Sequence, residues 1–493
     1  MLPLDSLQSC DLLIDGGTIV DGSGAPRYAG SVAITDGRIV GLGELGGISA
    51  HERINADGLM VAPGFIDAHT HDDRLVLSSP DMTPKISQGV TTVIAGNCGV
   101  SLAPLRLDRA PPPPMNLLGG QDWYRFSSLS EYAAAIEADP PAVNLAALVG
   151  HSTLRAGAMA DLGEPASASE VGRMADGLEA ALEEGAVGLS TGLAYPTASA
   201  APAEEVTALA ARLAPYGAIY TTHMRDEGDY LIEAVEEALG TGRSAGVRVV
   251  ISHHKAIGRE NWGRTKQSLA LIEAARRSQA VDFDVYPYTA SSTVLIADWI
   301  ERCEKVLVTW SEAAPEQAGR ELAEIAADWG CSLIEAADRL QPAGAVYFQM
   351  DEADLQRVLA HPRAMIGSDG LPHDARPHPR LWGTFPRVLG HYCRELGLFS
   401  LEEAVHRMTG VAAEVFGLTD RGVLREGAAA DLVLFDPETV IDRADYDDPK
   451  QPAAGIRQVI VAGQPVWDGE AWTGKRPGRF LRRGGQPSLA AGV

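Results

Sequence analysis

The pattern of hydrophobic and polar positions divides the chain into three parts. The first part contains short Val- and Ile-rich runs separated by Asp-Gly pairs, as in CDLLIDGGTIVDGSG, which is typical of β-hairpins. Similar runs, punctuated by Gly, Asp and Pro, return near the C-terminus, as in ADLVLFDPETVID. We therefore expect a small, discontinuous β-sandwich domain built from residues 1–62 and 420–480. Two unrelated β segments are the alternative interpretation.

The central part alternates between helix-like and strand-like segments. Stretches such as EEVTALAARLA and DYLIEAVEEAL place apolar residues at i, i+3 and i+4, the spacing of an amphipathic helix. Short, continuous apolar runs occur between such stretches, and these runs suit strands that are buried on both faces of a parallel sheet. Eight runs follow one another: VAPGFIDAHTH, GVTTVIAGNC, AVNLAALVGH, AVGLSTGL, GAIYTTHM, VRVVISHHK, AVDFDVYPY and RAMIGSDG.

Eight strand–helix units predict an α/β fold with a closed (β/α)8 TIM-like barrel over residues 63–419. A doubly wound open sheet is the structural alternative, and it would require no particular number of strands. Two segments exceed ordinary connections: the Pro-rich stretch 103–128 after the second strand, and an insertion at about 289–346 after the seventh. We expect both segments to lie over the rim of the barrel and to shape a substrate pocket.

Titratable and aromatic side chains gather at the carboxyl ends of these runs, where barrels of this kind carry the active site. His69 and His71 are two residues apart on the first strand, so their side chains leave the same face. Four of the histidines (His69, His71, His223 and His253), one thiol and one carboxylate at one mouth fit zinc, whereas an all-oxygen magnesium site would not need the imidazoles or the thiol. The gathered residues are His69, His71, Cys98, His151, His223, His253, Tyr286 and Asp369.

Composition narrows the range of partners. The formal net charge of −25 argues against nucleic acid and anionic membrane surfaces, since both bind clusters of Lys and Arg. The five cysteines are odd in number and without a spacing pattern, which argues against a disulfide framework and favours a reducing compartment. No signal peptide is recognisable, and no apolar run approaches the roughly 18 residues of a membrane span. We expect a cytoplasmic protein that binds a small molecule, neither nucleic acid nor membrane.

Several motifs point to one family. They include APGFIDAHTHDD, GVTTVIAGNCG, TTHMRDEG, ISHHK, and IGSDG with PHPRLWGTFPR after it, and they extend over nearly the whole chain. With these motifs the chain resembles the amidohydrolase superfamily and, within it, the N-acyl-D-amino-acid deacylases, also called D-aminoacylases. The cysteine after the second strand and the SHHK motif point to this branch.

The resemblance implies one tightly bound zinc ion and a second, weaker site. Many superfamily members place a carboxylated lysine between two metals, but the fourth run has Ser190 and Thr191 there, and a bridging Cys98 thiolate would supply the same negative charge. The implied ligands are Cys98, His223 and His253 for the tight site, and His69, His71 and Asp369 for the weaker site.

The resemblance also implies a reaction, the hydrolysis of the amide bond of an N-acyl-D-amino acid to a carboxylic acid and a free D-amino acid. Asp369 would carry a proton from the water to the leaving nitrogen; covalent catalysis by Cys98 is the competing mechanism. Arg380 would bind the α-carboxylate of the substrate. The further substrate-binding candidates are Tyr286, Tyr195 and Lys255.

Some alternatives remain open at this point. Instead of binding substrate, Tyr195 could pack against a loop, and Lys255 could form a salt bridge on the rim. The rival functions are another amide hydrolase of the superfamily, of the hydantoinase or dihydroorotase type, and a non-catalytic scaffold. If the insertion lines the side-chain pocket, Leu295, Ile296 and Trp299 favour apolar substrates. The acyl group, the number of metals and the oligomeric state stay open.

Overall fold

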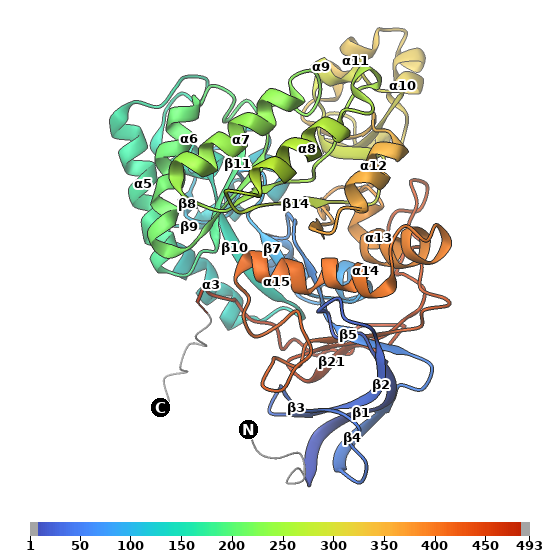
Figure 1. The fold of residues 1–493 in the computed structure, drawn as a ribbon. Coiled ribbons are helices and arrows are strands. Elements are labelled where there is room, and N and C mark those ends of the chain that lie inside the picture. The colour runs from blue at the N-terminus through green and yellow to red at the C-terminus, as the bar shows by residue number, and fades with distance from the viewer. Residues whose placement is uncertain (1–7, 485–493) are drawn as a thin grey trace.

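Eight parallel strands form the centre of the protein in a computed structural model that describes residues 8–484 (Figure 1). The amide of Ala68 donates to the carbonyl of Ile366, and that of Asp369 to the carbonyl of His69, so the first and eighth strands are joined. The predicted barrel is therefore confirmed, and an open sheet is excluded. The strands are β6 (Phe65–Asp67), β7 (Val90–Ala95), β10 (Asn144–Gly150), β11 (Gly188–Gly192), β12 (Ile219–His223), β13 (Val249–Ile251), β14 (Val281–Val285) and β18 (Ala364–Ile366).

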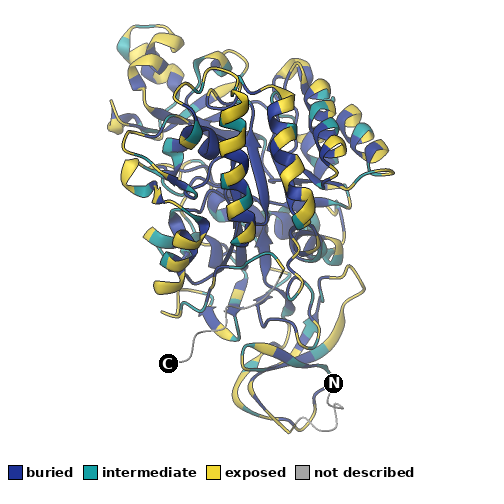
Figure 2. Ribbon diagram, turned by 90° about the vertical axis from the view of Figure 1, so that its left-hand side faces the viewer, coloured by how far each residue is buried: buried dark blue, intermediate teal, exposed yellow. Residues whose placement is uncertain are grey.

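Amphipathic helices surround the barrel. Their apolar sides face the strands and their polar sides face solvent, as the exposed outer surfaces in Figure 2 show. In α7, for example, Val235, Ala238 and Leu239 are buried, as the i, i+3, i+4 pattern predicts. The main helices are α3 (Leu129–Ala138), α4 (His151–Ala158), α5 (Ala168–Glu183), α6 (Ala203–Ala210), α7 (Leu231–Ala245), α8 (Thr265–Ala275), α12 (Glu352–Leu359), α13 (Arg380–Arg387), α14 (Leu401–Met408) and α15 (Gly410–Phe416).

The lower end of the barrel is closed by apolar packing. Ile66, Ile94, Val250 and Met365 form one buried cluster inside the barrel, and α15 contributes Phe416 to the same cluster. This packing excludes water from the amino-terminal ends of the strands. The carboxyl rim is therefore the end at which a polar site can form.

Strands from both ends of the chain form a second sheet (Figure 1). In this sheet β5 pairs in parallel with β1 and antiparallel with β19, so the two terminal segments build one β unit, as predicted, and are not unrelated. The exact domain limits, 1–62 and 420–480, stay a prediction. The strands are β1 (Ser9–Ile19), β2 (Tyr28–Thr35), β3 (Arg38–Gly43), β4 (Ser49–Asn55), β5 (Met60–Pro63), β19 (Leu432–Phe435), β20 (Ile456–Val461) and β21 (Gln464–Trp467).

The expected insertion after the seventh barrel strand has its own small sheet and core. Three antiparallel strands pack against short helices, and Ile325, Leu340 and Tyr347 are buried between them. Between residues 8 and 484, no helix combines the length and apolar character needed to cross a membrane. The elements of the insertion are β15 (Ala290–Val294), α9 (Ala297–Ile300), β16 (Lys305–Ser311), α10 (Leu322–Trp329), α11 (Leu333–Leu340) and β17 (Ala343–Phe348).

A buried ion-pair network joins the ends of the first and eighth barrel strands. The Lys85 ammonium, fully buried, lies 2.8 Å from Asp67 Oδ2 and 3.2 Å from Asp72 Oδ2, and it also donates to Ser368 Oγ at 2.8 Å. Asp67 in turn accepts a hydrogen bond from the Ser368 amide. Burial raises the pKa of Asp72 to about 6, although Lys85 opposes this shift. The network therefore depends on the lysine as its only cation among these four residues.

We expect Lys85→Met to destabilise the fold by about 3–5 kcal/mol, because it leaves two buried carboxylates without their counter-ion. Urea denaturation followed by circular dichroism measures the effect. Arg106→Ala is the control, since Arg106 pairs with Glu131 in solvent, and it should change stability little. An unchanged unfolding midpoint for Lys85→Met would show that the network does not hold the two strands.

Candidate active site

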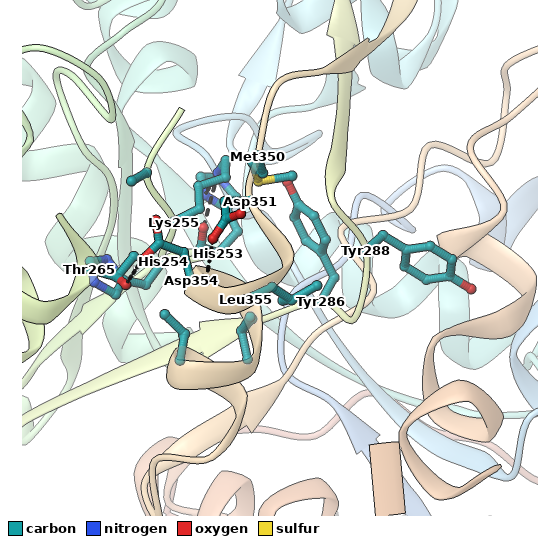
Figure 3. Close-up of a pocket in the computed structure, with 13 residues that line it drawn as sticks. His253, His254, Lys255, Thr265, Tyr286, Tyr288, Met350, Asp351, Asp354 and Leu355 are labelled. Carbon is teal, nitrogen blue, oxygen red and sulfur yellow. Dashed lines mark hydrogen bonds between the residues drawn. The ribbon is translucent and has the colours of Figure 1, made fainter. Parts of the chain in front are cut away.

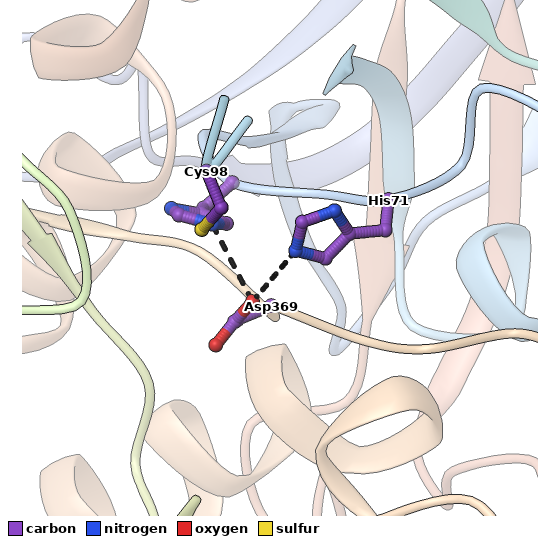
Figure 4. A group of neighbouring side chains, drawn as sticks. His71, Cys98 and Asp369 are labelled. Atoms are coloured by element: carbon purple, nitrogen blue, oxygen red, sulfur yellow. Dashed lines mark hydrogen bonds and ion pairs between the residues drawn. The ribbon is translucent and has the colours of Figure 1, made fainter. Parts of the chain in front are cut away.

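The six residues predicted as metal ligands converge at the carboxyl rim of the barrel. They form two groups that share Cys98, and within each group the potential ligand atoms lie within 4.8 Å of one another. Every member is buried. Figure 4 shows Cys98 and His71 pointing toward Asp369. The first group is His69, His71, Cys98 and Asp369, and the second is Cys98, His223 and His253.

The Cys98 sulfur lies between the two groups. Cys98 Sγ is 3.2 Å from His69 Nε2 and 3.4 Å from His253 Nε2. His253 Nε2 is in turn 3.0 Å from His223 Nδ1. On the other side, Asp369 Oδ1 lies 3.1 Å from His71 Nε2 and 3.4 Å from His69 Nε2. One thiol can therefore serve both groups.

The backbone bends sharply at three of these residues. Cys98, His253 and Asp369 have positive φ angles of 52°, 37° and 48°, a region that residues other than glycine rarely adopt. Such strain is often found at functional sites. Each of the three residues follows the end of its strand by two or three positions, so the bend places its side chain on the rim.

The glycine before Cys98 explains the GNCG motif. Gly96 has a φ of 79°, and a Cβ atom there would lie 2.2 Å from the carbonyl oxygen of Leu148. Only glycine fits, because the turn after β7 presses against β10. The Cys98 thiol is thereby held on the rim instead of in the apolar core.

Two of the potential metal ligands, Cys98 and Asp369, are negatively charged and lie among the imidazoles. Burial opposes ionisation of Cys98, but the nearby His69 and His253 rings outweigh it and hold the pKa of the thiol well below its usual range. Burial likewise opposes ionisation of Asp369, but Arg380 and His69 keep the pKa of this carboxyl well below its usual value. Thiolate, imidazole and carboxylate ligands in two groups of three or four fit zinc.

Two carboxylates support the histidines from behind, and the sequence did not single them out. Glu227 Oε1 lies 3.0 Å from His253 Nδ1, and Asp284 Oδ1 lies 3.2 Å from His69 Nδ1. The available signals were weak: Glu227 ends the TTHMRDE stretch, and Asp284 alternates with Phe283 on the seventh strand. Such partners select the ring nitrogen that faces a metal.

The predicted substrate-binding residues Arg380 and Lys255 already contact other groups of the protein. Arg380, fully buried, places Nη1 2.9 Å from Asp369 Oδ2, donates from Nη2 to the Ser292 carbonyl, and stacks on the Tyr286 ring at 4.5 Å. Lys255 donates to Glu227 Oε1 at 2.7 Å. Its ammonium is therefore part of a buried ion pair rather than a free charge.

A cavity lies beside the two groups. Tyr195, Lys255 and Tyr286 line it from the barrel, and Ser292 and other residues line it from the insertion. The Tyr195 hydroxyl forms a hydrogen bond with Thr293 Oγ1 at 3.0 Å. Three buried polar atoms close by have no hydrogen-bond partner among residues 8–484: Tyr286 Oη, Ser292 Oγ and Arg380 Nε. A buried donor without a partner is costly, so these atoms mark a place for a polar ligand.

Two histidines turn away from the rim. Figure 3 shows His254 directed toward Thr265, on the opposite side from the Tyr286 ring, and its Nε2 lies 2.8 Å from Ser268 Oγ. His151 bonds with Glu205 at 2.9 Å and belongs to neither group of potential ligands. Position at a strand end therefore brings most, but not all, of the expected side chains together.

The fold and these side chains together define a (β/α)8 barrel whose rim fits a metal centre. The sequence matches the model of the amidohydrolase family over residues 52–467. The chain belongs to the amidohydrolase family.

Relatives and solved structures agree with this assignment. The chain is 52% identical to D-aminoacylase of Alcaligenes xylosoxydans xylosoxydans over 97% of this chain and 98% of that protein. A D-aminoacylase crystal structure, described as defining a novel subset of amidohydrolases, has a TM-score of 0.94 at 52% identity and covers 96% of this chain and 100% of its own. N-acyl-D-glutamate deacylase of Bordetella bronchiseptica, solved with zinc and a phosphonate mimic of the tetrahedral intermediate, has a TM-score of 0.92 at 48% identity, with 96% and 100% covered.

Proposed function

We propose that the protein is a zinc-dependent deacylase that hydrolyses the amide bond of N-acyl-D-amino acids, producing a carboxylic acid and a free D-amino acid. The observation that carries the proposal is a thiol, Cys98, shared by two groups of buried ligands beside a cluster of unpartnered donors. The similarity to D-aminoacylase over nearly the whole chain supports the same activity. In keeping with the unpaired cysteines, we place the enzyme in the cytoplasm.

The proposed metal ligands follow the two groups. A bound zinc ion would act as a Lewis acid toward a water molecule and the substrate carbonyl. The tight site would use Cys98, His223 and His253, while the second and weaker site would use His69, His71 and Asp369, with Cys98 shared.

Asp369 would move the proton. Its carboxylate is ionised because Arg380 and His69 favour the charged form, so an oxygen of Asp369 can accept a proton from the attacking water. The same oxygen then delivers this proton to the amide nitrogen, since an amine leaves poorly as an anion. Covalent attack by Cys98 is disfavoured, because a thiolate held between three imidazoles is committed as a ligand.

The α-carboxylate of the substrate would bind at the unpartnered donors. Arg380 Nε, Tyr286 Oη and Ser292 Oγ are buried and unbonded within residues 8–484, and a carboxylate can accept from all three donors. Tyr195 would form part of the wall of the same cavity. Lys255 also lines this cavity, with its ammonium bonded to Glu227.

The wall of the cavity favours neutral substrate side chains. Leu117, Trp299 and Leu371 line it. Lys255 is the single lysine or arginine among the described residues that line the cavity, and the Glu227 carboxylate neutralises its charge. An acidic side chain would therefore enter without a counter-ion, which is costly in a buried site.

A hydrolysis panel tests the function and its rivals. We expect turnover of N-acetyl-D-leucine and N-acetyl-D-methionine, kcat/KM at least about tenfold lower for N-acetyl-D-glutamate because its second charge stays unpaired, and negligible turnover of the L-enantiomers. Released amino acid is measured by chromatography. Hydrolysis of hydantoin or dihydroorotate instead would favour the hydantoinase or dihydroorotase type, and no turnover of any substrate would favour the scaffold.

Removing the shared thiol should abolish metal binding. We expect wild-type protein to purify with zinc and Cys98→Ala to lose most of it, together with activity, because both groups lose a ligand. Elemental analysis of dialysed protein measures the zinc content, and circular dichroism checks the fold. A folded variant with full zinc content would return Cys98 to the class of ordinary buried thiols.

Asp369→Ala should separate binding of the tight zinc from turnover. The variant keeps the Cys98, His223 and His253 ligands, so we expect one zinc per chain, while kcat falls by about 10²–10⁴-fold because the proton carrier is lost. Steady-state kinetics and elemental analysis on the same preparation measure both. Turnover near that of the wild type would remove Asp369 from this role.

A further inference from the structure

Glu227 stands behind both histidines of the second group. It is buried and lies four residues after His223. Glu227 Oε1 is 3.0 Å from His253 Nδ1, and Oε2 is 3.9 Å from His223 Nε2. The nitrogens that face the other members of the group are the opposite ones, His253 Nε2 toward Cys98 and His223 Nδ1 toward His253. A single carboxylate therefore contacts or approaches the outward edge of both rings.

Two groups of opposite charge compete for His253 Nδ1. Glu227 is an acceptor and favours a proton on this nitrogen. Lys255 Nζ is a donor that lies slightly closer to Nδ1, at 2.7 Å against 3.0 Å for Glu227 Oε1, and it is also 2.7 Å from Glu227 Oε1. If Lys255 donated to Nδ1, the proton of a neutral imidazole would sit on Nε2, and Nε2 could not bind a metal.

We infer that Glu227 is a positioning residue for the tight metal site: it keeps the proton of His253 on Nδ1 and binds the Lys255 ammonium, so that Nε2 faces Cys98 with its lone pair free. This inference rests on the proposed zinc-dependent function. It assigns Glu227 an effect on metal affinity rather than a contact with the reacting atoms.

A matched control exists elsewhere in the chain. Glu205 is also buried and bonds to a histidine and a cation, with Oε1 2.9 Å from His151 Nε2 and paired with Arg155 Nη1. Neither His151 nor Glu205 belongs to the groups of potential ligands. Glu205→Gln therefore removes the same kind of buried charge without touching the metal site.

The experiment measures zinc affinity by competition with a chromophoric chelator for the wild type, Glu227→Gln, Lys255→Met, the double variant and Glu205→Gln. We expect Glu227→Gln to weaken zinc binding by about 10–100-fold, the range typical of partners that orient a ligand. Lys255→Met should keep affinity near that of the wild type. The double variant should regain most of the affinity lost in Glu227→Gln, because the competing donor is gone, and Glu205→Gln should bind zinc like the wild type.

Circular dichroism of the zinc-free proteins confirms that each variant is folded, so that affinities can be compared. Equal zinc affinity for Glu227→Gln and the wild type would overturn the inference. So would a double variant that binds zinc no better than Glu227→Gln. A wild type that binds no zinc would instead overturn the proposed function.

Discussion

The closure of the barrel is the constraint on which the site depends. Two backbone hydrogen bonds join the first strand to the eighth, one from Ala68 to Ile366 and one from Asp369 to His69. Without this closure, His71 and Asp369 would lie at opposite edges of an open sheet. With it, side chains nearly three hundred residues apart come within 3.1 Å. Packing of α15 under the barrel and the buried Lys85 network both stabilise this arrangement.

The rim concentrates charge that the fold has to balance. The site brings the Cys98 thiolate, the Asp369 carboxylate and several imidazoles together in a largely buried space, and such groups are stable there only when paired. Arg380 balances Asp369, and Lys255 balances Glu227. The same arrangement leaves unbonded donors nearby, and two of them, Tyr286 Oη and Ser292 Oγ, belong to residues that line the cavity. The pairing that makes the buried charges tolerable therefore also decides where an anionic substrate group can bind.

The barrel and the rim position of the candidate ligands were within reach of the sequence, because both depend on local order. Continuous apolar runs between amphipathic helices predicted the strands, and the carboxyl ends of parallel strands meet at one rim whatever the loops do. His69, Cys98 and His253 each follow such a run directly. Residues whose role depends on a partner were out of reach. Glu227, Asp284 and Ser292 look like ordinary polar residues in the sequence, and the contacts that make them candidates are with neighbours that are distant in sequence.

What the sequence determined by itself is the periodicity, and with it the barrel, the two-ended β unit, the insertion and the rim position of the candidate ligands. The tertiary structure alone decided which side chains are free. Arg380 and Lys255 were both candidates for binding the substrate, with a salt bridge as the alternative for Lys255. In the structure each lies against a carboxylate, Arg380 against Asp369 and Lys255 against Glu227. The hydrophobic period reflects which residues of a single helix or strand are buried, so it can be read from the local sequence. Charge pairing depends on distances of a few ångströms between side chains on different elements. No local sequence pattern contains those distances.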